Sequence, residues 1–368
     1  MRFLVWLCFV LAHTVSAAPI SELGGRRVPI DFGVDFVSHD DNKAFLFTKE
    51  DNQRLFVVDL ARWGREYLEG QAVLPTPGRN ITILKSGVIE GWLYIAMTWV
   101  ERDGFPIQIF GKPVTHVMDP AISWSEIGAS FKLSFRPGHD FKMQFDPYSP
   151  FVYSAGSALG LIGGLRRLNL QTGQWQFVDI GHLSGDFGLT KKFLVVSETR
   201  HDGTPITKSD LIVLGKENLT RVSSHRLTGY SESFVADHDQ MYQILPSMDP
   251  AKPTREIVTI SLPSLDQASV LELPSSGRIG LTRSIGESLL FIDGGTDHQP
   301  SIVTLTLFSI KDGSQCEMGQ FRSNGELESI DLVQGTDPRL ISIEEPGYYR
   351  PAQLRAFVIR DLILNPCN

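Results

Sequence analysis

The sequence is poor in cysteine and has no excess of basic charge. Only 3 of its 368 residues are cysteine, too few for a disulfide scaffold, so a large apolar core must provide most of the stability. Acidic side chains outnumber basic ones by 42 to 34, and no basic stripe with interleaved aromatic residues occurs. Because binding to a phosphate backbone needs a positive face, we do not expect a nucleic-acid partner.

Long apolar runs are also missing, so we expect no membrane span. The chain opens with Met1-Arg2, an apolar run from Phe3 to Ala12, and small residues up to Ala18. A basic start, about ten apolar residues and a small-residue cleavage site predict a secretory signal peptide over residues 1–17. A retained signal anchor is the alternative, which the short apolar run disfavours. We therefore expect residues 18–368 to form one secreted, extracellular and monomeric domain.

Cleavage of the leader would remove Arg2 and Cys8. The mature chain then has 33 basic and 42 acidic side chains, a net charge of −9. Its remaining cysteines, Cys316 and Cys367, are expected to form a disulfide bond, as is usual for two cysteines in an exported chain. The two Asn-x-Thr patterns predict glycosylation at Asn80 and Asn218.

Motifs of enzymes and cofactor sites are absent as well. The sequence has no HExxH, no CxxC, no phosphate-cradling glycine loop and no dinucleotide fingerprint. Gly156-Ser157-Ala158-Leu159-Gly160 comes within one residue of the Gly-x-Ser-x-Gly motif, but it does not lie at a strand-to-helix turn. The motifs therefore predict neither a metal site nor a cofactor.

What the chain does contain is a recurring pair of short apolar runs. Residues 151–199 alone hold four such runs separated by turn residues, the pattern of an antiparallel meander. Equivalent points in seven pairs are 42 to 59 residues apart, namely Phe45, Leu93, Val152, Leu194, Tyr242, Leu290 and Leu340. A period of 40–50 residues with four strands per unit is typical of a propeller blade.

We therefore predict an all-β fold, a single β-propeller of seven four-stranded blades, or of six if the second unit is not a blade. That unit fits poorly, because Lys112–Asp140 is long enough to hold an extra hairpin or a long loop. Two β-sandwiches would need a linker near the middle of the chain, and a β-helix would need shorter repeats. The chain ends must meet to avoid bare sheet edges. Either the strand after Val28 or the tail Asp361–Cys367 is expected to complete the last blade.

Two fragments resemble a known repeat family. Leu168–Trp175 resembles the third strand, turn and tryptophan of a kelch repeat, and Phe291–Gly295 resembles the kelch double glycine. The Gly-His and Trp-Asp pattern of WD40 repeats is absent. The resemblance implies a propeller and no particular activity.

Carboxylates on or beside the innermost strands form the first group of candidate site residues. We expect them to line the central channel, where they could bind Ca²⁺ or supply an acid and a base for glycoside cleavage. They need no function, because propeller channels are polar in any case. The candidates for catalysis are Asp31, Asp186, Asp237 and Asp331, and the other members of the group are Asp35, Asp146, Glu232 and Glu328.

The loops between second and third strands form the second group. Thr98–Phe105 and Glu344–Pro351 should lie on one face, and both are rich in residue types that dominate binding hot spots. The candidate contact residues are Trp99, Arg102, Tyr348, Tyr349 and Arg350. The alternative reading is that these side chains merely cover the blade ends.

The sequence thus favours a non-catalytic protein that binds an extracellular protein or glycan. The alternative is an extracellular hydrolase, glycosidase-like or lactonase-like, that uses the channel carboxylates, with or without Ca²⁺.

Overall fold

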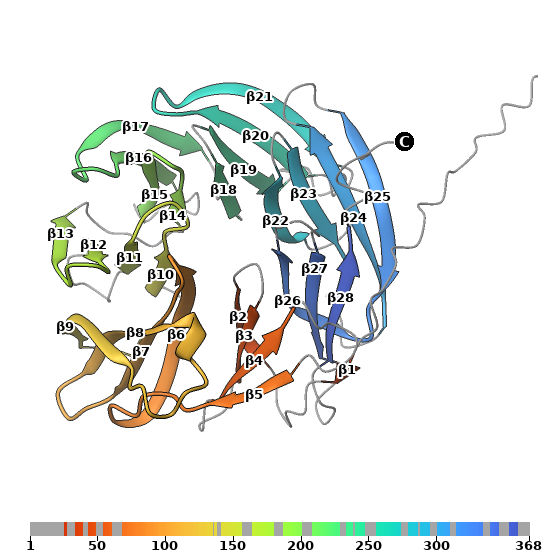
Figure 1. The fold of residues 1–368 in the computed structure, drawn as a ribbon. Coiled ribbons are helices and arrows are strands. Elements are labelled where there is room, and N and C mark those ends of the chain that lie inside the picture. The colour runs from red at the N-terminus through yellow and green to blue at the C-terminus, as the bar shows by residue number, and fades with distance from the viewer. Residues whose placement is uncertain are drawn as a thin grey trace, which may run out of the picture.

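The computed structural model arranges the chain as four-stranded antiparallel sheets around a central axis (Figure 1). It describes residues 26–27, 34–39, 43–48, 54–60, 68–134, 136–137, 141–156, 164–179, 187–200, 208–228, 233–237, 240–246, 255–273, 279–285, 288–294, 300–309, 314–333, 339–345 and 353–359. The predicted signal peptide, residues 1–17, lies outside this description.

The described residues form seven sheets, which we number as blades. From the innermost to the outermost strand they are β2 (Val34–His39), β3 (Lys43–Thr48), β4 (Leu55–Asp59) and β5 (Leu68–Ala72) in blade 1; β6 (Arg79–Ile89), β7 (Trp92–Val100), β8 (Phe105–Pro113) and β9 (Ser125–Leu133) in blade 2; β10 (Phe141–Phe145), β11 (Phe151–Gly156), β12 (Gly164–Asn169) and β13 (Trp175–Asp179) in blade 3; β14 (Phe187–Leu189), β15 (Phe193–Arg200), β16 (Lys208–Gly215) and β17 (Arg221–Thr228) in blade 4; β18 (Ser233–Asp237), β19 (Gln240–Pro246), β20 (Arg255–Ser261) and β21 (Asp266–Leu273) in blade 5; β22 (Ile279–Ile285), β23 (Ser288–Asp293), β24 (Ile302–Ser309) and β25 (Gln315–Arg322) in blade 6; and β26 (Glu326–Val333), β27 (Arg339–Glu345), β28 (Gln353–Val358) and β1 (Arg26–Arg27) in blade 7.

The second unit is an ordinary blade, so the count is seven and not six. Its extra length is taken up by a single 3₁₀ turn, η1 (Val114–His116), and by the loop that leads on to β9. An extra hairpin is not present among these residues. The long connection matters below, because it forms one wall of a pocket.

The apolar core lies between the blades. The middle strands are buried on both faces: in β7, every residue from Leu93 to Trp99 is buried. Side chains of neighbouring blades share one cluster, as Phe45 and Val57 of blade 1 do with Leu93 and Ile95 of blade 2. Each fully buried Leu, Ile or Phe contributes about 1.5–3 kcal/mol, which explains why a single sheet would not be stable alone.

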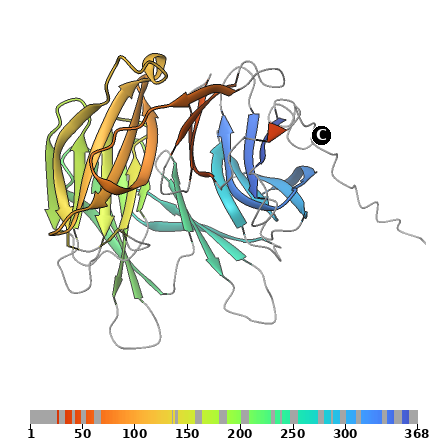
Figure 2. The same ribbon diagram turned by 90° about the horizontal axis from the view of Figure 1, so that it is seen from below.

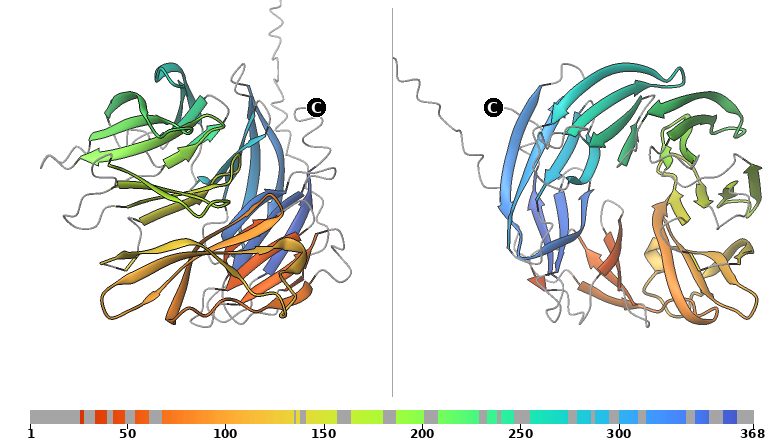
Figure 3. Two further views of the ribbon diagram at one scale, coloured as in Figure 1. Left: turned by 60° about the vertical axis from the view of Figure 1, so that its left-hand side comes forward. Right: turned by 180° about the vertical axis from the view of Figure 1, so that it is seen from behind.

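The ring closes through a short strand from the start of the chain. β1 pairs antiparallel with β28, with Arg26 opposite Leu354 and Arg27 opposite Gln353. Figures 2 and 3 show this junction from below and from behind, with the blue strands of blade 7 next to the red and orange strands of blade 1. The innermost strands β2 and β26 are in contact there.

The expected closure was therefore wrong in one respect. The strand that completes the last blade precedes Val28 and does not follow it, because the chain after Val28 supplies β2, the innermost strand of blade 1. The other candidate, Asp361–Cys367, lies outside the described residues.

The turn of the kelch-like fragment shows how the sequence fixes a hairpin. The side chain of Asn169 accepts hydrogen bonds from the backbone N–H groups of Gln171, at 2.9 Å, and Thr172, at 3.0 Å. Gly173 has φ +69°, a conformation that glycine adopts without strain. The turn therefore delivers Trp175 to the outer strand, where its indole N–H donates to the carbonyl of Ala129 in blade 2.

Candidate functional site

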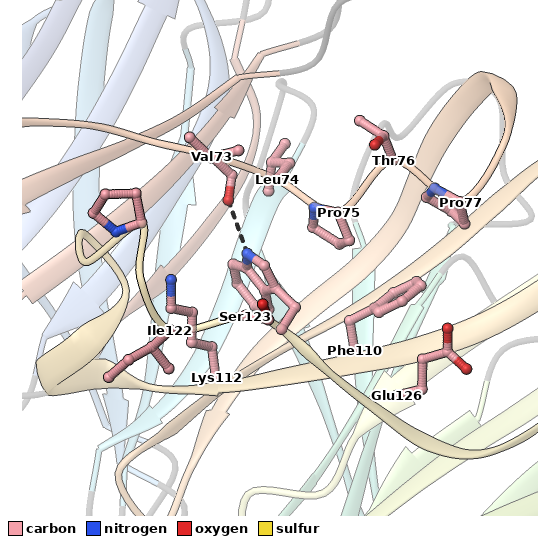
Figure 4. A pocket seen from close by; sticks show the side chains of 12 residues that line it. Val73, Leu74, Pro75, Thr76, Pro77, Phe110, Lys112, Ile122, Ser123 and Glu126 are labelled. Atoms are coloured by element: carbon pink, nitrogen blue, oxygen red, sulfur yellow. Dashed lines mark hydrogen bonds between the residues drawn. The ribbon is translucent and has the colours of Figure 1, made fainter.

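A pocket of about 380 Å³ lies between blades 1 and 2 (Figure 4). One wall is the segment that leaves β5, and the other is built from β8, the loop after η1 and the start of β9. The lining residues are Val73, Leu74, Pro75, Thr76, Pro77, Phe110, Lys112, Pro120, Ile122, Ser123, Trp124 and Glu126. This volume is at the lower end of the range typical of ligand pockets, ~300–1,000 Å³.

The two walls are joined by one hydrogen bond. The indole N–H of Trp124 donates to the carbonyl oxygen of Val73 over 2.8 Å, drawn as the dashed line in Figure 4. Pro75 and Pro77 have fixed φ angles and no N–H groups, so their segment stays extended and cannot pair as a sheet strand. The bond thus links the two walls, and the prolines restrict the backbone of one of them.

Lys112 supports the pocket from beneath. Its residue is only 3% exposed, and its Nζ donates to the carbonyls of Val117, at 3.2 Å, and Asp119, at 2.8 Å. The ammonium also lies 5.8 Å from the centroid of the Trp124 ring, within range of a cation–π interaction. Burial lowers the pKa of Lys112, and the charge of Asp119 partly counteracts that effect.

Glu126 provides the charged group of the pocket that is exposed to solvent. It lies at the start of β9, on the same wall as Lys112 but toward the other end of the pocket (Figure 4). Within the described part of the chain, its carboxylate has no hydrogen-bond or ion-pair partner. Apolar walls with a few polar groups are what small binding pockets usually have, so this arrangement can bind and orient a ligand.

The predicted contact loop between β7 and β8 is a tight hairpin closed by a bridge between Glu101 and Gly104. Its tip is an exposed charge network in which the Nζ of Lys132 lies 2.7 Å from Glu101 and 2.8 Å from Asp103. Arg102 is exposed at the same tip, so it can reach a partner as expected.

Trp99 does not fit the prediction for this loop. It belongs to β7, is only 8% exposed, and its indole N–H donates to the side chain of Glu101 at 3.0 Å. Its ring also fills the space above Gly78, where a Cβ atom would lie 2.3 Å from the ring. The burial of both faces of the middle strand places Trp99 in the core and not on a binding surface. Tyr348, Tyr349 and Arg350 lie outside the described residues.

The predicted channel carboxylates lie on or next to the innermost strands, and only some of them are among the residues that the structure describes. Asp237 lies on β18 and Asp331 on β26, both innermost strands as predicted, but their side chains are not described. Asp31 and Asp186 lie outside the described residues. No group of three or more His, Cys, Asp or Glu side chains that could hold a metal ion occurs in the described ranges.

Asp146 was expected to face the channel, and this was wrong. Its side chain is fully buried and lies 2.6 Å from the Nζ of Lys216, which comes from the turn between β16 and β17. It also accepts hydrogen bonds from the N–H of Tyr148 and the hydroxyl of Ser149. Asp146 follows β10 in the turn that leads to β11 of blade 3, and its ion pair with Lys216 joins blade 3 to blade 4.

The predicted covalent features have mixed outcomes. Cys316 on β25 is engaged in a disulfide bond, but Cys367 lies outside the described residues, so their pairing stays a prediction. Asn80 and Asn218 are both exposed, which is compatible with glycosylation at either. In the described residues, no helix is long and apolar enough to span a membrane.

Sequence reasoning missed the pocket because its lining comes from two blades. Two signals pointed to it: Pro75-Thr76-Pro77 next to a strand, and the unusual length of the second unit with its Trp124. Neither signal reveals that the two segments face each other, since that depends on how adjacent blades stack.

No protein-family model matches the chain, and no curated protein matches its sequence. Solved structures do match. Sqt1 of Saccharomyces cerevisiae has a TM-score of 0.50 and 11% identity, over 94% of this chain and 100% of that one. The uncharacterized protein lmo1340 of Listeria monocytogenes EGD-e has a TM-score of 0.53 and 7% identity, over 87% of this chain and 94% of that one. Likeness at such low identity shows the fold alone, a β-propeller.

Proposed function

We propose that the protein is a secreted, monomeric β-propeller that binds an extracellular protein or glycan without catalysing a reaction. The observation that supports this function best is the pocket between blades 1 and 2. It combines prolines and aromatic rings with an exposed carboxylate, and its two walls are fixed to each other by the Trp124–Val73 hydrogen bond. Arg102, exposed on the β7–β8 hairpin, supplies a second contact region.

The kelch-like relationship belongs to the same proposal. The Leu168–Trp175 fragment forms a strand, an Asn-stabilised turn and a following strand, as the resemblance implies. A hydrolytic activity would instead use a pair of channel carboxylates, with Asp31, Asp186, Asp237 and Asp331 as the candidates, or a Ca²⁺ ion bound by such carboxylates. The one channel candidate with a described side chain, Asp146, is buried in an ion pair, so we prefer the binding function.

The test is direct binding by the purified mature protein, residues 18–368. Biolayer interferometry against panels of extracellular ectodomains and of glycans should identify a partner that binds the wild type. Trp124→Ala should weaken this binding because it removes a wall of the pocket. Val222→Ser is the matched control, since Val222 is 49% exposed on β17 and distant in sequence from the pocket.

Melting temperatures show whether Trp124→Ala remains folded, and Trp124→Phe provides a milder second variant that lacks the N–H donor. A panel partner that is lost with Trp124→Ala and kept with Val222→Ser supports the proposal. Hydrolysis of a glycan or lactone by the wild type, abolished by Asp237→Asn, would contradict it.

A further inference from the structure

We propose that the pocket between blades 1 and 2 receives the basic end of a lysine or arginine side chain from a protein partner. The inference rests on the proposed function, because it names the ligand class of the same pocket. It is carried by the shape of the walls, the fixed aromatic ring and the position of the exposed carboxylate.

The walls suit the apolar stem of a basic side chain. Pro75, Pro77 and Ile122 provide aliphatic surface, and Phe110, only 4% exposed, forms the apolar floor. Lysine and arginine bury their methylene groups along such surfaces while their charged ends stay near water. A volume of about 380 Å³ can hold one long side chain with part of its backbone, and it is too small for the edge of a folded domain.

Trp124 presents to the pocket an indole ring whose orientation is restrained by a hydrogen bond. Its hydrogen bond to Val73 fixes the indole plane, and the negative face of an indole ring is the best aromatic acceptor for a cation in proteins. The ammonium of Lys112 already lies near this ring, 5.8 Å from its centroid. The hydrogens of Lys112 are directed at the carbonyls of Val117 and Asp119, so that ammonium is not itself available to a ligand.

Glu126 decides between a basic ligand and a neutral one. Its carboxylate is exposed at the pocket and has no partner in the described residues, so an incoming ammonium or guanidinium gains an ion pair there. The net charge of −9 on the mature chain draws basic partners from a distance. An uncharged glycan would gain nothing from either feature.

The experiment uses capped five-residue peptides, Gly-Gly-X-Gly-Gly, titrated into the mature protein and followed by ligand-detected NMR. X is lysine, arginine, norleucine or glutamate; norleucine keeps an apolar stem and lacks the charge. We expect the lysine and arginine peptides to bind about fivefold more tightly than the norleucine peptide, as one partly exposed ion pair allows. The difference should shrink as salt is added.

Variants locate the effect. Glu126→Gln should remove the preference for the basic peptides without changing the melting temperature, because the side chain is exposed. Glu217→Gln is the matched control: it makes the same charge change at another exposed site, on the turn after β16. Equal binding of the norleucine and lysine peptides would overturn the inference. An equal loss of preference in both variants would also overturn it, since net charge alone would then explain the binding.

The outcomes separate this inference from the proposed function. Suppose that a panel partner is lost with Trp124→Ala and unaffected by Glu126→Gln. The binding function would then stand, and the basic-side-chain inference would fall. If a partner binds and neither variant changes its binding, the pocket is not the binding site: the basic-side-chain inference falls, while binding through another surface, such as that around Arg102, stands.

Discussion

Two buried lysines near blade junctions, Lys112 and Lys216, differ in the groups that their ammonium ions contact. Lys112 in blade 2 is 3% exposed and Lys216 in blade 4 is 6% exposed. Both donate to backbone carbonyls, and both lie near an aromatic ring, Trp124 at 5.8 Å and Tyr148 at 5.2 Å. Only Lys216 has a carboxylate partner, Asp146 at 2.6 Å. Lys112 contacts neutral acceptors alone within the described residues.

The difference distinguishes two kinds of junction between blades. We call a junction sealed where an ion pair links the two blades, as between blades 3 and 4, and open where a pocket lies between them, as between blades 1 and 2. Lys216 crosses to blade 3, and Arg167 of blade 3 returns the contact by donating to the carbonyls of Lys216 and Glu217. Lys112 instead holds a loop of its own blade, which leaves room between blades 1 and 2 for the pocket. Burial lowers the pKa of both lysines. The charge of Asp119 partly counteracts this at Lys112, and a direct hydrogen bond to the Asp146 carboxylate does so at Lys216. We infer that charge pairing marks structural junctions here and that its absence accompanies the candidate binding site.

The largest expected effect is at the sealed junction. Lys216→Met leaves the fully buried carboxylate of Asp146 without its cation, which should destabilise the protein by about 3–5 kcal/mol. The midpoint of urea unfolding measures the change. The double variant with Asp146→Asn should recover part of the loss, because no charge is then left buried. A single variant within 1 kcal/mol of the wild type would contradict the role of this pair.

A second sealed site lies in blade 7, where Glu344 is fully buried. Its carboxylate accepts hydrogen bonds from Arg355 at 2.9 Å, from the N–H of Asn324 at 2.7 Å, and from Ser342 at 3.0 Å. Arg355 also donates to the carbonyl of Arg322 in blade 6, so the cluster joins two blades. Burial is the main influence on Glu344 and raises its pKa above 4.5.

The raised pKa of Glu344 predicts how stability depends on pH. The folded protein holds this proton more tightly than the unfolded chain, so unfolding releases it between pH 4.5 and the folded pKa. The contribution of Glu344 is therefore present below this window and is lost as the pH rises through it. Glu344→Gln should flatten that part of the profile of melting temperature against pH and cost about 1.5–3 kcal/mol overall. An unchanged slope in the variant would contradict the raised pKa.

The fold could be predicted from the sequence, because its signal is local. Each blade contains short apolar runs such as Phe151–Ser154 and Leu165–Leu170. The spacing of these runs along the chain, 42 to 59 residues per unit, predicts the propeller architecture. The site could not be predicted in the same way. Trp99 and Arg102 are three residues apart on one hairpin, yet Trp99 is only 8% exposed whereas Arg102 is exposed to solvent. That difference depends on the packing of the neighbouring segment at Gly78, which no residue type reveals.

The open junction should respond less than the sealed ones. Lys112→Met removes two hydrogen bonds to carbonyls and leaves no unpaired charge, so we expect a loss of about 1–2 kcal/mol. Urea midpoints of this variant and of Lys216→Met, measured side by side, test the comparison directly. If Lys112→Met costs as much as Lys216→Met, the carboxylate partner is not what distinguishes the two junctions.

The smallest effect concerns the turn that Lys216 anchors. Asn218 and Thr220 are both exposed there, and the side chain of Asn218 accepts hydrogen bonds from the N–H of Thr220 at 3.1 Å and from its hydroxyl at 2.7 Å. Asn80 lies instead within β6 at φ +53°, and Thr82 is half-buried against β7. We therefore expect Asn218 to be the more fully glycosylated of the two. Protein secreted from a eukaryotic host should lose one glycan mass with Asn218→Gln, while stability changes by less than about 0.5 kcal/mol. A glycan that persists in this variant and disappears with Asn80→Gln would reverse the order, because strand geometry would then not limit modification.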